Sequence, residues 1–466
     1  MEIEQAVEMA MGRSKRFNPD QFEAYGSRNH LITIRMATNR VEEAKSLQTG
    51  GVSVRLVLGG SIGFASTSSL TEASLGGMVE KACQLAKAKK PDPDFKSLPE
   101  PRKVEGLEGG YDRELMDLDL EAATAYGKDA LKAAHEVDAT LDVSGSVNIV
   151  AEECWIQNSL GVNCSDVNTT IYSSITVEKG EETSGMGQAC SKTLKGFNAE
   201  AAAREAAEAA AEGARGGKTV SPGRYDIIFG PYAASELIEF VLSYALDLSA
   251  VDVGISYFRD KLGEEVASRD LTLTDDGRSK VGVASKSVDD EGVPTRKTEL
   301  VRGGVLKGFL ANSYYANKLT SPSRPLTSTG NGFRIGDLPG RSHSTMPSIQ
   351  TTNLVVEAGD RSLQELISET SRGILLGRVW YTYPLNPTVG DFSTTNRGQT
   401  FYIEGGEIRH PVKPNSFRIS DNLPKLLKQI EGLGREQIQS MVWGSATTCI
   451  TPHIKFRDVN VTYSKD

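Results

Sequence analysis

The residues best placed to do chemistry are two glutamates, Glu236 and Glu239, on a helix that also carries Tyr232. A carboxylate can act as a general base or bind a metal ion. A peptidase helix that binds zinc would also need two histidines one turn apart. No histidine lies between His135 and His343. The helix therefore offers carboxylates without the imidazoles that would complete a zinc site.

Cys449 and His453 form a second pair of potential metal ligands near the end of the sequence. The threonines and the proline around them disfavour a helix. In a strand the two residues would lie about 13 Å apart, at a rise of ~3.3 Å per residue, whereas zinc ligands stand only about 2.0–2.3 Å from the metal. We therefore expect a half-buried strand thiol and a surface imidazole, and the sequence assigns no role to either.

An acidic run, Asp289, Asp290 and Glu291, precedes Gly292. Clustered carboxylates could bind a cation. A solvated turn is the commoner meaning of such a run, because the charges stay hydrated there and the glycine permits the turn. The run is therefore predicted to lie in an exposed turn.

A polar segment, NPTVGDFS at 386–393, is followed by two threonines and an asparagine between strand-like sequences. Asp391 stands between Gly390 and Phe392, which suits the close approach of another backbone, such as a bound peptide. Structural turns use the same residues about as often. Asn386, Asp391 and Ser393 are the candidate lining of a substrate channel.

Two glycine motifs do not support further sites. Residues 59–63 match the G-x-S-x-G pattern of a nucleophile elbow, but the sequence after them favours a strand, so a hairpin is the better interpretation. Gly330, Gly332 and Gly336 have the wrong spacing for a dinucleotide fingerprint and follow turn formers instead of a strand.

Composition excludes several classes of protein. The chain has 466 residues, a net charge of −9 and a pI near 5.4, and it lacks the basic cluster that nucleic-acid binding needs. We find no apolar run of about 18 residues and no signal peptide, so a soluble protein without a membrane partner is expected. Five scattered cysteines without C-x-x-C spacing indicate reduced thiols in the cytoplasm.

Residues 1–220 are predicted to form an N-terminal α+β domain of helices and antiparallel strands. A proline-rich segment at 91–113 is the expected linker within it. Helices are predicted at 2–14, 70–85, 118–136 and 198–213, and strands at 22–25, 30–36, 52–58, 61–67, 142–159 and 168–179.

The helix that carries Glu236 must be a core element. It follows the apolar strand at 225–229, with Gly230 as N-cap and Pro231 in the first turn. Seven apolar residues recur at helical spacing on one face, which must be buried: Ala234, Leu237, Ile238, Val241, Leu242, Ala245 and Leu246.

Residues 221–466 are predicted to form a β-rich domain, barrel-like or sandwich-like and mostly antiparallel. Glycine pairs at 303–304 and 405–406 mark hairpin turns. Strands are expected at 271–274, 298–310, 353–359, 373–384, 399–412 and 453–463, and helices at 362–371 and 423–433.

From about residue 20 to its end, the chain resembles the TldD/PmbA family, also called TldD/TldE. The resemblance rests on segments in the same order and spacing, including 63–75, 221–237, 289–310, 386–393 and 401–413. It implies a two-domain α+β subunit that dimerises to enclose a channel. It also implies a cytoplasmic metallopeptidase that acts on unfolded or leader peptides.

The resemblance fails at the metal site. In the family, the TldD-type subunit carries an H-E-x-x-x-H helix and a cysteine ligand near its C-terminus, whereas residues 232–239 here contain no histidine. The context of Cys449 is similar to PmbA/TldE-type subunits. The implied protein is a non-zinc subunit, with no cofactor of its own, whose TldD-type partner holds zinc.

Two alternatives remain at this stage. One is an independent homodimeric hydrolase that uses Glu236 or Glu239, and the other is a peptide-binding homodimer. The family's further label, modulator of DNA gyrase, suggests a link to nucleic acid that the acidic charge does not support directly.

Overall fold

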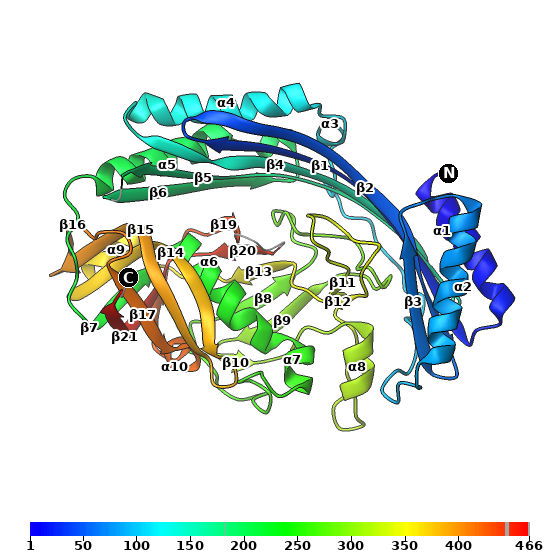
Figure 1. The fold of residues 1–466 in the computed structure, drawn as a ribbon. Helices are drawn as coiled ribbons and strands as arrows, with labels where there is room; N and C mark the ends of the chain where they lie inside the picture. The colour runs from blue at the N-terminus through cyan, green and yellow to red at the C-terminus, as the bar shows by residue number, and fades with distance from the viewer. Residues whose placement is uncertain (181, 443–446, 465–466) are drawn as a thin grey trace.

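The computed structural model describes residues 1–180, 182–442 and 447–464. They form a long N-terminal sheet that arches over a C-terminal domain rich in short strands (Figure 1). The class is α+β with mostly antiparallel sheets, as predicted. In these described ranges, no helix combines the length and the apolarity needed to cross a membrane.

The N-terminal sheet has six antiparallel strands in the order β3-β2-β1-β4-β5-β6. The runs 22–25 and 30–36 are parts of one strand, and the strand predicted at 52–58 begins at Arg40. The strand at the β6 edge was not predicted. The strands are β1 (Gln21–Ala37), β2 (Arg40–Leu58), β3 (Ser61–Thr67), β4 (Asp142–Asn158), β5 (Asn163–Lys179) and β6 (Thr183–Ser191).

Helices cover one face of this sheet. In Figure 1, α4 (Leu120–Val137) and α5 (Ala199–Gly213) lie over one end, and α1 (Ile3–Ser14) and α2 (Glu72–Ala88) pack at the other. The alanine face of α5 lies flat on β6, where a Cβ at Gly185 would stand 1.9 Å from the backbone oxygen of Ala206. The helix can approach β6 this closely only because position 185 is a glycine.

The opposite face of the sheet is polar, and along the first part of β1 it is also buried. Alternate residues of β1 point away from the helices, and Glu23, Tyr25, Ser27 and Asn29 are at most 4% exposed. These residues face the C-terminal domain. Along residues 23–29, β1 is therefore buried on its polar face as well, whereas Arg35 on the same face is exposed.

Five strands of the C-terminal domain close into a barrel, because β14 pairs with both β7 and β15. This confirms the barrel-like prediction. The barrel strands are β7 (Gly223–Phe229), β14 (Arg372–Asn386), β15 (Asp391–Glu404), β17 (Phe417–Asn422) and β21 (Ile454–Tyr463), with β16 (Glu407–Pro411) and β18 (Ile430–Leu433) paired outside the ring.

A second sheet lies beside the barrel, in the order β10-β9-β8-β13-β20-β19. Its strands β13 and β20 run parallel, and the other pairs are antiparallel. These strands are β8 (Leu273–Asp276), β9 (Lys297–Arg302), β10 (Val305–Leu306), β13 (Asn353–Val356), β19 (Ile438–Met441) and β20 (Thr448–Thr451), and a separate hairpin joins β11 (Gly332–Phe333) to β12 (Ser348–Ile349).

Short helices complete the domain. The helix predicted at 423–433 is wrong in its second half, because α10 ends at Leu427 and β18 begins at Ile430, where the chain pairs with β21. The remaining short helices are α3 (Arg113–Met116) in the N-terminal half, α7 (Leu248–Asp252), α8 (Ser313–Leu319) and α9 (Leu363–Ser368).

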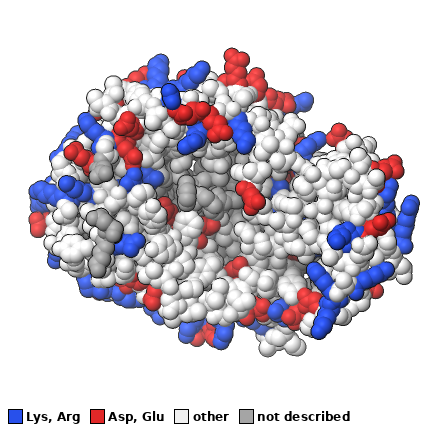
Figure 2. Space-filling model, viewed as in Figure 1, with Lys and Arg blue, Asp and Glu red and all other residues white. Residues whose placement is uncertain are grey.

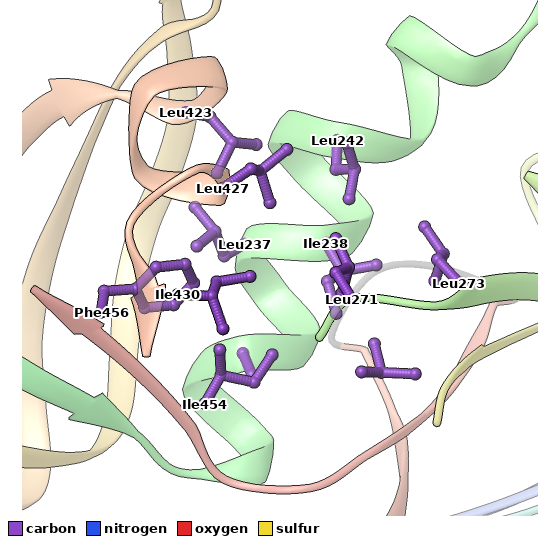
Figure 3. Close-up of a pocket in the computed structure, with 12 residues that line it drawn as sticks. Leu237, Ile238, Leu242, Leu271, Leu273, Leu423, Leu427, Ile430, Ile454 and Phe456 are labelled. Atoms are coloured by element: carbon purple, nitrogen blue, oxygen red, sulfur yellow. The ribbon is translucent and has the colours of Figure 1, made fainter. Parts of the chain in front are cut away.

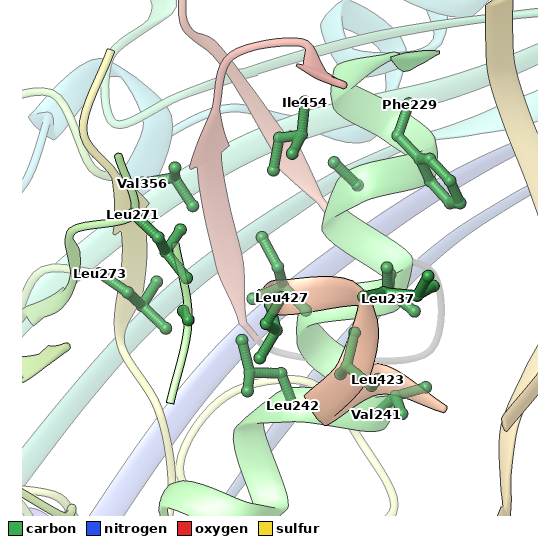
Figure 4. Packing of buried hydrophobic residues seen from close by; sticks show 14 of the residues in the cluster. Phe229, Leu237, Val241, Leu242, Leu271, Leu273, Val356, Leu423, Leu427 and Ile454 are labelled. Carbon is green, nitrogen blue, oxygen red and sulfur yellow. The ribbon is translucent and has the colours of Figure 1, made fainter. Parts of the chain in front are cut away.

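Helix α6 (Pro231–Leu237) is the centre of the C-terminal core. It continues as a π-helical turn at Ile238–Leu242 and a 3₁₀ turn at Ser243–Leu246. All seven predicted apolar residues are at most 5% exposed, which confirms the buried face. They pack between the barrel and the second sheet, against Phe229, Leu273 and Leu423 among others (Figure 4).

A small gap of about 20 Å³ remains beside α6, lined by twelve apolar residues (Figure 3). A water molecule needs two to four polar partners, and this lining offers none. The gap is therefore an apolar packing defect in the core around α6.

Candidate functional site

A cleft of about 520 Å³ separates the polar face of the N-terminal sheet from the C-terminal domain. It lies where the space-filling view is hollowed between the two halves of the molecule (Figure 2). Its roof consists of β4, β5 and β6, and its floor of the loop between β11 and β12 and the strands near β19 and β20. This volume falls within the ordinary range for ligand sites, about 300–1,000 Å³.

The lining of the cleft is rich in hydroxyl and amide groups. Asn148, Tyr172 and Ser174 project from the roof, and Gln350 and Thr351 from the floor. These groups can donate and accept hydrogen bonds without carrying charge. Such a surface suits the main chain of a peptide, whose N–H and C=O groups alternate.

One wall of the cleft is a network of buried charges. Arg341 lies 2.6 Å from Asp290 and 2.5 Å from Asp166, and Lys286 pairs with Glu152. Burial, with the nearby charge of Arg341, holds the pKa of Lys286 well below its ordinary value. The network joins β4 and β5 to the C-terminal domain, so it fixes the width of the cleft at this end.

A second layer of the network lies deeper. Arg334 pairs with Glu23 of β1 and lies over the ring of Tyr25, 4.4 Å from its centroid. The Tyr25 hydroxyl donates to Asp290 at 3.0 Å, and burial raises the pKa of this tyrosine. The phenol therefore stays protonated and serves as a donor.

The acidic run is the centre of this network, and its prediction as a solvated turn was wrong. Asp289, Asp290 and Glu291 are at most 1% exposed. Asp289 accepts hydrogen bonds from three backbone N–H groups, and Glu291 accepts from Ser313. Burial, together with the charge of Glu291, raises the pKa of Asp289. Each carboxylate thus has protein partners.

Helix α6 turns a polar face toward the N-terminal domain. The Tyr232 hydroxyl donates to Glu205 of α5 at 3.0 Å and accepts from the backbone N–H of Gln188 in β6 at 3.2 Å. Glu236 accepts from the hydroxyl of Thr382 at 3.0 Å. Burial raises the pKa of Glu236 to about 7, against the opposing effects of Thr382 and Arg378. The pKa of Glu236 therefore lies near neutrality.

Cys449 packs against this helix. It is fully buried in β20, not half-buried as predicted, and its sulfur lies 3.8 Å from the backbone oxygen of Ser235. Burial, and then the charge of Glu239, raises the pKa of the thiol. His453 lies beyond the end of β20 and is partly buried, not a surface imidazole, and burial lowers its pKa.

These donors do not suit a zinc ion. A peptidase helix that binds zinc carries imidazoles, whereas helix α6 carries none and the thiol of Cys449 lies within the hydrophobic core cluster. The hydroxyl of Ser235, on the neighbouring turn, is bonded to Ser440 at 2.7 Å. Among the residues that the structure describes, no three His, Cys, Asp or Glu side chains are grouped as metal ligands would be.

Asn386, Asp391 and Ser393 lie at or near the hairpin between β14 and β15, beyond the part of β14 that pairs with β7. The segment 386–393 is a tight turn followed by a strand, since β15 begins at Asp391. Asn386 is exposed, Asp391 accepts from Asn422 at 2.9 Å, and Ser393 is buried. These three residues do not line the cleft, and their role in a channel stays a prediction.

Lys286, Arg341 and Gln188 could not be identified as parts of a site from local sequence. Each of them has a side-chain hydrogen bond to a residue more than 100 positions away, in another domain. A run of glycines at 330–340 is the local signal that could have indicated the loop carrying Arg341, because it marks close approach of backbones.

Family models match almost the whole chain. The PmbA/TldA metallopeptidase domain 1 matches residues 22–86, the central domain 113–213 and the C-terminal domain 222–463. The three matched ranges leave residues 87–112 and 214–221 between them.

Individual relatives are consistent with these matches. A metalloprotease of Methanothermobacter thermautotrophicus is 27% identical over 87% of this chain and 86% of its own length. A metalloprotease TldD homolog of Buchnera aphidicola is 27% identical over 84% and 83%. The crystal structure of TldE from Thermococcus kodakarensis covers 98% of this chain and 100% of its own, at 27% identity and a TM-score of 0.88.

Proposed function

The chain belongs to the PmbA/TldA metallopeptidase family, and we propose that it is the TldE-type subunit of a cytoplasmic TldD–TldE-type peptidase. In this role it holds part of an unfolded or leader peptide, while a TldD-type partner supplies the zinc ion and cuts the peptide. The zinc would polarise the scissile carbonyl and activate water in the partner. No step of that chemistry falls to residues of this chain.

One observation carries the proposal. Helix α6 keeps its full apolar face in the core but carries Ser235, Glu236 and Glu239, with no imidazole, beside the buried thiol of Cys449. Since the donor set does not suit zinc, a peptidase that contains this chain needs its metal from another subunit. The likeness to the Thermococcus TldE structure over both full lengths supports the same assignment.

In this proposal, the cleft is where the subunit holds the peptide. An extended peptide can be held without regard to sequence when its main chain pairs with polar groups of the protein. The roof strand β6 and the floor strand β19 are sheet edges that face each other, and the Gln188 side chain of β6 already donates to the backbone oxygen of Met441 at 3.1 Å. A bound peptide strand would replace this hydrogen bond with hydrogen bonds from its own main chain.

The experiment compares this chain alone, a TldD-type subunit alone and their mixture. Bound zinc is measured by mass spectrometry of the metal, and cleavage is followed on an unstructured, fluorescently labelled peptide. We expect cleavage in the mixture only, and zinc in proportion to the TldD-type subunit. Stoichiometric zinc together with cleavage by this chain alone would refute the proposal.

An independent hydrolase is the second candidate, and the pKa of Glu236 favours it. A carboxyl group that titrates near 7 has the value that a general base needs at neutral pH. This candidate requires cleavage by the chain alone that is lost in Glu236→Gln. The same three-way assay therefore separates the two functions.

A further inference from the structure

The outer face of the β14–β15 hairpin carries a row of exposed apolar side chains. Tyr381, Tyr383 and Leu385 are 62%, 40% and 56% exposed, and Val389 in the turn is 46% exposed. Thr382, between the two tyrosines, is buried. The row thus lies on one side of the hairpin, and we call these four residues the hairpin stripe.

The backbone presents this stripe by a special conformation. Tyr381 has a φ of 52°, in the left-handed region that a tyrosine rarely adopts, and the pairing of β14 with β15 shifts register between Trp380 and Tyr383. A bulge of this kind redirects a side chain. Strained residues persist where the surrounding structure holds them, and they cluster at functional surfaces.

The turn under the stripe is held in place. The Tyr244 hydroxyl donates to the backbone oxygen of Pro387 at 2.9 Å, and the Asn422 side chain donates to that of Val389 at 2.7 Å. Leu423, the first residue of α10, donates its N–H to Gly390 at 2.9 Å. A rigid turn loses little conformational freedom on binding, which favours association.

The stripe also lacks charge. Of the seventeen residues 380–396, Asp391 alone is charged, whereas a charged content of 24% would put about four charges in a segment of this length. Nucleic acid and anionic membranes require basic residues, so neither is a suitable partner. The core of a protein interface is depleted of charge and enriched in tyrosine.

The exposed area suits half of an interface. At about 200 Å² for each large side chain, the four exposed fractions amount to about 400 Å², whereas each partner contributes about 800 Å² to a standard interface. A polar rim commonly supplies the remainder. The stripe is therefore large enough to be the apolar centre of a subunit contact.

We propose that the hairpin stripe is the surface on which the TldD-type subunit docks. This assignment rests on the proposed function. If the partner has the same fold, a twofold or near-twofold arrangement would place the equivalent hairpins of the two subunits against each other. An uncharged, apolar stripe requires an uncharged, apolar surface on the partner.

The test uses the double variant Tyr381→Ser/Leu385→Ser, with Tyr111→Ser as matched control. Tyr111 is 54% exposed but lies in the N-terminal half. Each variant is titrated against a TldD-type subunit, with the dissociation constant measured by fluorescence anisotropy. We expect at least about 30-fold weaker binding for the double variant, because central aromatic anchors dominate interface energies, and an unchanged constant for the control.

Thermal melting checks the fold of each variant. The substituted side chains are exposed, so the melting temperature should not fall. A charged variant, Leu385→Asp, gives an independent measurement, because a buried unpaired carboxylate opposes docking.

Three outcomes would overturn the assignment. Wild-type affinity in folded stripe variants would place the contact elsewhere while leaving the proposed function intact. Normal subunit binding with loss of binding to an unstructured peptide would make the stripe a peptide surface. If the wild-type subunits form no complex, both the proposed function and this assignment are wrong.

Discussion

The guanidinium of Arg341, in the C-terminal domain, lies 2.5 Å from the carboxylate of Asp166 in the N-terminal sheet. A second nitrogen of Arg341 lies 2.6 Å from Asp290, and these side chains are at most 6% exposed. Opposite charges buried at such distances depend on each other, since removing one leaves the others unpaired away from water. The relative position of the two domains therefore depends on this arginine.

Arg341→Met should lower the free energy of unfolding by about 3–5 kcal/mol, because it leaves two buried carboxylates without their partner. Urea denaturation followed by tryptophan fluorescence measures the change. Arg224→Met is the matched control, since Arg224 pairs with Asp458 at the surface, where such pairs contribute about 0–1 kcal/mol. Equal losses in the two variants would contradict a structural role for the buried network.

Stability should depend on pH through Glu236. Its pKa is about 7 in the folded chain and 4.5 in its unperturbed state, so between these values the folded state holds a proton that the unfolded state has released. The contribution of Glu236 to the free energy of unfolding is therefore fully present below about pH 4.5. It falls by roughly 3 kcal/mol in total as the pH rises to about 7.

Glu236→Gln isolates this contribution, because other buried acids titrate in the same range. Burial raises the pKa of Asp275 to about 6, for example. The unfolding free energies of wild type and variant are compared at pH 5 and at pH 7.5. Relative to the variant, the wild type should be less stable at pH 7.5 than at pH 5. A constant difference would mean that Glu236 is ionised in the folded chain at both pH values.

The activity of the complex should be insensitive to the same substitution. In the proposed function Glu236 is a core acid of the non-zinc subunit, so Glu236→Gln should leave kcat/KM of the complex within about twofold of wild type. Steady-state cleavage of the unstructured peptide measures this. A loss of about 100-fold in a folded, partner-bound variant, or about 2.7 kcal/mol in the barrier, would show that Glu236 takes part in catalysis.

The sequence predicted those parts of the fold that local pattern determines. The apolar spacing from Ala234 to Leu246 identified a helix with one buried face, and the Gly230–Pro231 start of α6 is as expected. The glycine pairs at 303–304 and 405–406 lie in turns between paired strands. In each case, the residues that decide the structure are neighbours in the sequence.

The charge network could not be predicted in the same way. Asp290 and Arg341 look like surface residues in their local sequence, because charged side chains near glycines usually lie in solvated turns. They are buried only because β1 presents Tyr25, and β5 presents Asp166, from more than 120 residues away. The cleft follows from this packing, so it could not be located before the domains were seen together.

Ser174→Arg should block the cleft without unfolding the chain. Ser174 projects from β5 into the cleft opposite the floor strands, and a long side chain there would occupy space that a peptide needs. We expect KM of the complex for the unstructured peptide to rise about tenfold, equivalent to about 1.4 kcal/mol of binding, with little change in kcat because the zinc site lies in the partner. Ser66→Arg, at an exposed position of β3, is the control and should leave both constants unchanged. Unaltered KM in a folded Ser174→Arg complex would show that the substrate does not pass through this cleft.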